Sequence, residues 1–562
     1  MEAKEHLHNL LNHVWNRKVN RKLSLQLKQG LLVTSLPKGN LQEAEEDHDF
    51  AIDSLAVLKK MNKAGLSYED QLNYAFLQEY LLQESRKVDL WWAEFPVTPY
   101  TLYWMNIYAQ TLFAPFSFQK KDDMDRYLHL LHEFGDAIYT VLFKLQAQAK
   151  KGWYVPIPAL PKIIELLIQL QQTIPALLTV TPTRLHRLDK SVSMSFSEQV
   201  DQTITNRIVA AYQELLTLLQ AQEYQSACPE RVGIGQYPGG EEAYRHLVRM
   251  HVTYDIEPDK IHLIGLDQVR QLTEKMRTVR ESLGFQGSEA AFMEHIKTSG
   301  RLYAKSPEDV EQRYHFHLNR LKPLIHDYFH TIPKSIYQVK RLDAAYEASV
   351  AYGYFDPPSS TNPIGTYYYN GSGLETRSQL TASTLIYHEI IPGHHLQIGL
   401  QLENQQLPAI RRESMELTGY LEGWAEYGAG LPYEMGLAHD PYDWYGRLLH
   451  ERFIAQRLVV DTGMNVLDWS LQQAKEYMAK TTIESAEQIE AETLRYSTES
   501  PAQALAYRLG YLKFRELREK TEKSLGSLFD RKDYHEAILS PGSLPLYVLE
   551  EHIDHFIKER TQ

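Results

Sequence analysis

Most of the chain shows the apolar spacing of amphipathic helices. Between residues 122 and 151, apolar side chains recur every three or four positions and so share one helical face. The same spacing predicts helices near 160–178, 196–222, 241–253, 266–283 and 307–329. Ser306 suits the N-cap of the last of these. Helical spacing returns near 441–471, 486–494, 501–520 and 545–557, so the sequence predicts a mainly α protein.

One stretch has a different composition. Residues 335–370 mix β-branched and aromatic residues with proline and glycine, which is typical of strands and turns. They include Val339, Val350, Tyr352, Tyr354, Phe355, Ile364, Tyr367, Tyr368 and Tyr369. We expect a small antiparallel sheet here, with 366–370 as its edge strand. A strand edge can pair with an extended peptide, so this edge is a predicted substrate-binding surface.

No internal repeat and no long linker divides the 562 residues. We therefore expect residues 1–562 to form a single mainly helical domain, a two-lobed ellipsoid with a cleft between the lobes. The role of the N-terminal helical part, residues 1–120, stays open. Its aromatic cluster at 91–104 is better explained by packing between helices than by substrate binding.

The segment 381–402, predicted as a helix, carries three histidines and a glutamate within eight residues: His388, Glu389, His394 and His395. Burying polar groups without partners costs free energy, whereas a metal ion would satisfy these side chains. A His-Glu pair followed by a second His one turn later holds zinc in peptidases, with the Glu as base. In that arrangement the two histidines are four residues apart, but here the fourth position is Pro392.

The spacing does not suit a straight helix. At about 100° per residue, His394 would point about 120° away from His388, and His395 would lie about 10 Å along the axis. Pro392 lacks a backbone donor and Gly393 tolerates unusual dihedral angles, so we expect the helix to deform there. If these two residues bulge out, His394 becomes the second ligand. His395 remains the alternative.

A third ligand is expected from another element, because catalytic His₂Glu zinc sites leave the fourth position for water. Glu422 follows His394 by 28 residues, enough for the rest of one helix, a turn and a returning helix. The predicted metal-site helices therefore span 381–430. Glu416 and Glu413 are weaker candidates for the third ligand. Glu426, one turn beyond Glu422, would contact a ligand or be a solvated charge.

The two motifs resemble those of a bacterial domain-of-unknown-function family. Its HExxPGHHxQ and EGWAxY signatures match His388 to Gln397 and Glu422 to Tyr427. Weaker matches lie at 236–244, 261–266, 351–358, 501–510 and 542–549. The family is similar to zinc peptidases of the HExxH-plus-Glu kind, which include thimet oligopeptidases, angiotensin-converting-enzyme-like peptidases and thermostable carboxypeptidases.

The resemblance implies a zinc metallopeptidase that cleaves short peptides. Zn²⁺ would be held by His388, His394 and Glu422, with Glu389 as general base. The oxyanion would take a hydrogen bond from Tyr507, by its position in the family-like motif, with Tyr511 and Arg508 as alternatives. An arginine bound to a free C-terminal carboxylate would indicate a carboxypeptidase. The candidates are Arg377, Arg411, Arg412 and Arg508.

Composition narrows the function class. The chain has 59 basic and 72 acidic residues and a net charge of −13, which argues against a general nucleic-acid binder. One cysteine, Cys228, excludes an intramolecular disulfide framework. With no apolar signal region and no apolar run of about 18 residues, we expect no membrane partner and a cytoplasmic location.

Two other functions compete with the zinc peptidase. The first is a metal-free relative that binds peptides as a helical scaffold, which the Pro-Gly insertion leaves open. The second is a carboxylate-based glycoside hydrolase, suggested by 36 tyrosines and 8 tryptophans. Such enzymes need two carboxyl groups flanking a bond and no histidine cluster, so we rank this reading last.

Overall fold

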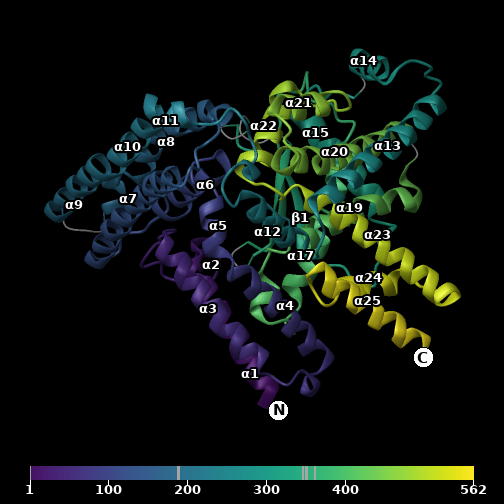
Figure 1. The fold of residues 1–562 in the computed structure, drawn as a ribbon, viewed down its shortest axis with the longest axis horizontal. Helices are drawn as coiled ribbons and strands as arrows, with labels where there is room; N and C mark the ends of the chain where they lie inside the picture. Colours follow the sequence, from purple (N-terminus) through teal and green to yellow (C-terminus); the bar gives the residue numbers. More distant parts are fainter. Residues whose placement is uncertain are drawn as a thin grey trace.

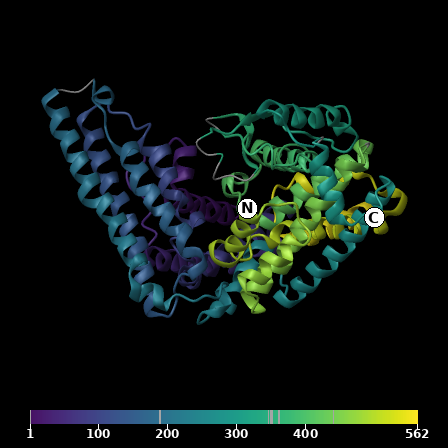
Figure 2. The ribbon, with the colours of Figure 1, turned by 90° about the horizontal axis from the view of Figure 1, so that it is seen from above.

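The computed structural model describes residues 2–186, 190–300, 302–344, 347, 352–359, 362–438 and 440–562. This part of the chain is mainly helical, as predicted, with one small sheet. Figures 1 and 2 show two lobes that diverge from a shared base. The first lobe contains α6 (Pro99–Tyr108), α7 (Lys121–Lys150), α8 (Leu160–Leu178), α9 (Lys190–Thr203), α10 (Ala210–Gln220) and α11 (Gln222–Ala227).

The second lobe contains the sheet and the helices from α12 to the C-terminus (Figure 1). These helices are α12 (Gly240–Val252), α13 (Pro258–Ser282), α14 (Glu289–Ser299), α15 (Pro307–Leu321), α16 (Ala382–Glu389), α17 (His394–Glu403), α18 (Ala409–Glu413), α19 (Thr418–Pro432), α20 (Pro441–Val466), α21 (Leu471–Ala479), α22 (Ala486–Leu494), α23 (Leu505–Leu525), α24 (Arg531–Leu539) and α25 (Leu546–Thr561). Ser306 caps α15 as predicted, since its side chain accepts a hydrogen bond from the Asp309 amide.

The hydrophobic core of the first lobe continues into the second lobe through residues of α12, α20 and α23. In the first lobe, Tyr127, Phe134 and Ile163 are fully buried among the apolar faces of α7, α8 and α10. One segment, Ile157–Leu185, is long and apolar enough to cross a membrane, with a mean hydropathy of 1.4. The expectation that no such run exists was therefore wrong. Its apolar face, which includes Ile163, packs into the first-lobe core.

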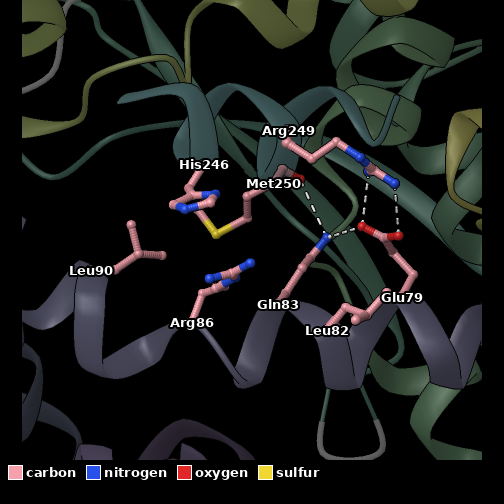
Figure 3. A pocket seen from close by; sticks show the side chains of 8 residues that line it. All are labelled: Glu79, Leu82, Gln83, Arg86, Leu90, His246, Arg249 and Met250. Atoms are coloured by element: carbon pink, nitrogen blue, oxygen red, sulfur yellow. Dashed lines mark hydrogen bonds and ion pairs between the residues drawn. The ribbon is translucent and has the colours of Figure 1, made fainter. Parts of the chain in front are cut away.

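The N-terminal helices are α1 (Glu2–Arg21), α2 (Leu23–Lys28), α3 (Leu41–Lys59), α4 (Tyr68–Glu84) and α5 (Lys87–Ala93). They dock on the second lobe through α12 (Figure 3). There Arg249 donates to both carboxylate oxygens of buried Glu79, at 3.0 and 3.1 Å. Gln83 donates to the Met250 carbonyl at 3.5 Å. A pocket of about 180 Å³ lies between α4 and α5 on one side and α12 on the other.

The sheet is mixed and has the order β1-β3-β2. β3 (Ile364–Tyr369) pairs in parallel with β1 (Ile336–Arg341) and antiparallel with β2 (Gly353–Asp356). The predictions of an antiparallel sheet and of an edge strand at 366–370 were therefore wrong. Composition locates strands but not their order, and β2 lies on the far side of β3 from β1. Val350 and Ala351, assigned to this region by the sequence, lie outside the described residues.

Candidate metal centre

The histidine segment forms two helices with a break between them. We expected one helix deformed at the Pro-Gly step, but residues 390–393 lie outside both α16 and α17. Pro392 cannot donate a helical hydrogen bond. At Gly393 a Cβ atom would lie 1.8 Å from the His388 carbonyl oxygen, so only glycine fits. The Trp424 indole of α19 donates to the Pro392 carbonyl at 3.0 Å and anchors the break.

The break places His394 beside His388. Their ring centroids lie 4.7 Å apart, with the ring planes at 86°. Oε2 of Glu422, on α19, lies 3.4 Å from Nε2 of His388 and 3.4 Å from Nε2 of His394. The three ligand atoms all lie within 4.8 Å of one another. The structure thus brings together the three side chains predicted as ligands.

This cluster fits a divalent cation. Glu422 Oε2 is buried and accepts no hydrogen bond from the part of the chain that the structure describes. Burial raises the pKa of Glu422, but the His394 and His388 imidazoles outweigh it and hold that pKa well below its usual range. Two imidazole nitrogens and a carboxylate around one point form the donor set of a catalytic zinc site with an open position.

From the sequence, Glu426 was expected either to contact a metal ligand or to be a solvated charge. In the structure it lies beside His388 and is fully buried. Its Oε1 lies 3.0 Å from Nδ1 of His388, outside good hydrogen-bond alignment, and 2.8 Å from Nε2 of His450. Arg447 donates to Oε2 at 3.0 Å and to the Glu426 carbonyl at 2.9 Å. When His388 is neutral, a carboxylate beside Nδ1 favours the proton on that nitrogen, so Nε2 is the nitrogen that would face a cation.

These contacts also set the charge states. Burial raises the pKa of Glu426, but His450 and Arg447 outweigh it and hold the pKa well below its usual range. Burial lowers the pKa of His388, but its contacts with Glu422 and Glu426 raise it overall, to about 10. Without a cation, His388 therefore holds a proton that metal binding would displace.

The charged network continues behind Glu426. Nε of Arg447 lies 3.0 Å from Glu451, and Nη1 donates to Thr384 of α16 at 2.9 Å. Arg508, which the sequence offered as an oxyanion donor, donates to Glu451 at 2.8 Å and to Gln268 at 3.1 Å. The side chain of Arg508 is thus committed to this network.

His395 does not join the cluster. Its Nε2 lies 3.1 Å from the Ser335 carbonyl oxygen, so the ring points towards the start of β1. The Gly365 backbone of β3 packs against the same ring, since a Cβ there would lie 2.4 Å from His395 Nδ1. The structure therefore places His394, not His395, beside His388.

The two weaker ligand candidates also point elsewhere. Glu416 forms ion pairs with Lys18 and Lys22 of the N-terminal region. Buried Lys18 also donates to Ser414 at 2.8 Å. Glu413 pairs with its neighbour Arg412 at 3.0 Å. The N-terminal helices thus hold the segment that leads into α19.

Glu389 and Tyr507 line a pocket of about 190 Å³, and His388 is the proposed ligand that shares its wall. The Tyr507 ring stacks against the His388 ring at 6.2 Å and 9°. Burial raises the pKa of Glu389, which suits a carboxylate that accepts a proton. Tyr511 instead packs beneath Arg508, at 4.6 Å, and lines a different pocket. Every residue that lines the Tyr507 pocket belongs to the second lobe or to the sheet.

Comparison with known proteins identifies the family. The profile of the family described as "Bacterial protein of unknown function (DUF885)" matches residues 26–553. The chain belongs to this family. No curated protein matches the chain.

Two solved structures share the fold of this DUF885 protein. One is "the putative lipoprotein from Colwellia psychrerythraea", at 22% identity and a TM-score of 0.85, with 99% of each chain covered. The other is "a putative lipoprotein of unknown function from Shewanella oneidensis", at 17% identity and a TM-score of 0.76. That match covers 97% of this chain and 99% of the other. At these identities the likeness shows the fold alone.

Three side chains at the site of this DUF885 protein were not predicted from the sequence, namely Arg447, His450 and Arg457, all on α20. The sequence predicted α20 only as a helix. A signal was present, because charged residues occur around all faces of an otherwise apolar segment. Such a helix must bury charges against partners from other elements.

Proposed function

We propose that this DUF885 protein hydrolyses peptide bonds of short peptides with the help of a zinc ion held by His388, His394 and Glu422. One observation carries the proposal: Glu422 Oε2 lies 3.4 Å from two imidazole nitrogens and has no hydrogen-bond donor in the described residues. A buried carboxylate in this position is stabilised by positive charge, which a metal ion would supply. The adjoining pocket, with Glu389 and Tyr507 in its wall, supports catalysis over a purely structural ion.

Zinc, when bound, supplies a Lewis acid that polarises the peptide carbonyl and makes water a better nucleophile near neutral pH. Glu389 takes a proton from the attacking water and returns it to the leaving amine. The Tyr507 hydroxyl donates a hydrogen bond to the developing oxyanion. Glu426 keeps the His388 ring oriented throughout.

The test combines metal analysis with a peptide library. The purified protein is assayed for zinc and incubated with mixed short peptides, with and without a chelator, and the products are identified by mass spectrometry. We expect one zinc per chain and cleavage that the chelator abolishes and added zinc restores. Glu422→Gln should lose both zinc and cleavage, whereas the matched control Glu413→Gln should keep both. Chelator-resistant cleavage, or a chain without stoichiometric zinc, would refute the proposal.

A chain that binds peptides but neither holds zinc nor cleaves them would be the helical scaffold considered above. The proposed location is cytoplasmic. The two structurally similar proteins are described as lipoproteins, which suggests a membrane-anchored alternative. Fractionation of cells that express the native gene would separate soluble from membrane-associated protein.

A further inference from the structure

Arg457 is a buried cation in the wall of the pocket beside Tyr507. It lies seven residues beyond His450 on α20, two helical turns along the same face. Only 9% of the residue is exposed. Its guanidinium carbon lies 4.8 Å from the Phe453 ring centroid and 4.8 Å from that of Tyr507. The aromatic rings thus fix the position of this charge.

The guanidinium has hydrogen-bonding capacity that the protein leaves unused. Arginine offers five N–H donors. In Arg457, Nη2 donates to Glu492 at 3.3 Å. Nε is buried without an acceptor, and none of the described residues accepts from Nη1. By contrast, Arg447 on the same helix donates to Glu426, Glu451 and Thr384 through all three nitrogens.

The four arginines suggested by the sequence do not compete for this role. Arg377 donates to the Ser372 carbonyl at 2.9 Å and lines a neighbouring pocket, which shares Tyr352, Thr381 and Leu385 with the Tyr507 pocket. The remaining three are engaged with protein acceptors, namely Arg411 with Asn73, Arg412 with Glu413, and Arg508 with Glu451. Of these five arginines, only Arg457 lines the pocket that also contains Glu389 and Tyr507.

We propose that Arg457 binds the free C-terminal carboxylate of the peptide substrate. The proposal rests on the proposed peptidase function and adds the end of the substrate that the site recognises. Nη1 carries two N–H donors that none of the described residues accepts, and a carboxylate oxygen accepts such charge-assisted hydrogen bonds. Glu492 occupies a different nitrogen, Nη2, and its other oxygen accepts from Gln488 at 3.2 Å.

The geometry also limits where the peptide is cut. The Tyr507 ring lies 6.2 Å from the His388 ring, and the guanidinium carbon of Arg457 lies 4.8 Å from the Tyr507 ring. These two steps keep Arg457 within about 11 Å of His388, the length of about three extended residues. Hydrolysis adds the water hydroxyl to the acyl carbon and a proton to the amine. The released fragment is therefore short and retains the bound carboxylate.

The experiment compares one peptide sequence with a free C-terminus and with a C-terminal amide. The native protein should cleave the free acid about 10-fold to 100-fold more efficiently than the amide. This ratio corresponds to the usual free energy of a charge-assisted hydrogen bond. Arg457→Met should reduce this preference to about threefold or less. Arg457→Lys, which keeps the charge without the planar fork, should be intermediate. The matched control Arg377→Met should keep the full preference.

A binding measurement separates this proposal from the proposed chemistry. Thermal unfolding of chelator-treated protein is followed with an N-acetylated dipeptide acid and with its amide. The acid should raise the Tm of native protein and of Arg377→Met, but not that of Arg457→Met. Equal effects of acid and amide in native protein would overturn the role of Arg457, even if the protein cleaves peptides. If neither peptide is cleaved, the proposed function fails, and the Tm comparison alone decides whether Arg457 binds carboxylates.

Discussion

Replacing Glu426 with Gln tests whether this residue orients a metal ligand. The substitution keeps the shape of the side chain but removes the charge that faces His388, His450 and Arg447. If the amide oxygen faces the two histidines, its NH₂ group faces Arg447, and two donors oppose each other at 3.0 Å. Loss of the group that orients a metal-binding histidine weakens metal binding about 10-fold to 100-fold, which corresponds to about 1.4 to 2.7 kcal/mol of binding free energy.

Folding stability should fall as well. Arg447 is fully buried, and breaking a buried ion pair costs about 3 to 5 kcal/mol. We expect the lower end of this range, about 3 kcal/mol, because Glu451 remains 3.0 Å from Arg447. Zinc affinity is measured on metal-free protein by competition with a chromophoric chelator, and stability by urea unfolding.

Glu451→Gln is the matched control. Glu451 pairs with Arg447 at 3.0 Å and with Arg508 at 2.8 Å, but makes no direct contact with His388. This variant should lose about as much stability as Glu426→Gln, about 3 kcal/mol, while binding zinc like the native protein. The reasoning is refuted if Glu426→Gln binds zinc with native affinity, or if both variants lose zinc affinity equally.

Three further predictions concern the base, the oxyanion donor and a buried carboxyl. Glu389→Gln should keep its zinc and lose about 10²-fold to 10⁴-fold in kcat, and undiminished turnover would remove Glu389 from that role. Tyr507→Phe should lose about 10²-fold to 10³-fold in kcat with little change in KM; an effect confined to KM would contradict oxyanion stabilisation. Burial raises the pKa of Asp461 to about 7, so the folded state keeps a proton that the unfolded chain releases near pH 4. Urea unfolding at several pH values measures the difference in free energy of unfolding between the native protein and Asp461→Asn. This difference should fall as the pH rises from about 4 to 7, and a rise would contradict the reasoning.

The sequence predicted helices better than it predicted the sheet. Apolar spacing locates α22 and the Ser306 cap well, because both depend on local preferences. Strand order depends on contacts between distant segments, and so β3 was placed at an edge although it lies in the centre. Spacing also could not show whether the Pro-Gly step bends one helix or separates two, since this depends on Trp424 from α19.

The candidate ligands followed from residue type and order, because few arrangements place His, Glu and His so close together. What the sequence could not supply was the set of side chains behind them. His450 and Arg457 belong to α20, which follows the histidine segment by about 50 residues and meets it only in the folded protein. Charged side chains buried along a helix need partners from other elements, but the sequence does not show which residues these partners are.

The ion pairs of Lys18 give the N-terminal helices a part in the site. Glu422 lies only six residues after Glu416, which Lys18 and Lys22 hold in place. Burial lowers the pKa of Lys18 to about 8, and the ion pair with Glu416 opposes this effect. A buried ion pair stabilises little against an apolar alternative, but it fixes the register of the elements that it joins. Here the pair joins the N-terminal helices to the segment that leads into α19, the helix that carries Glu422.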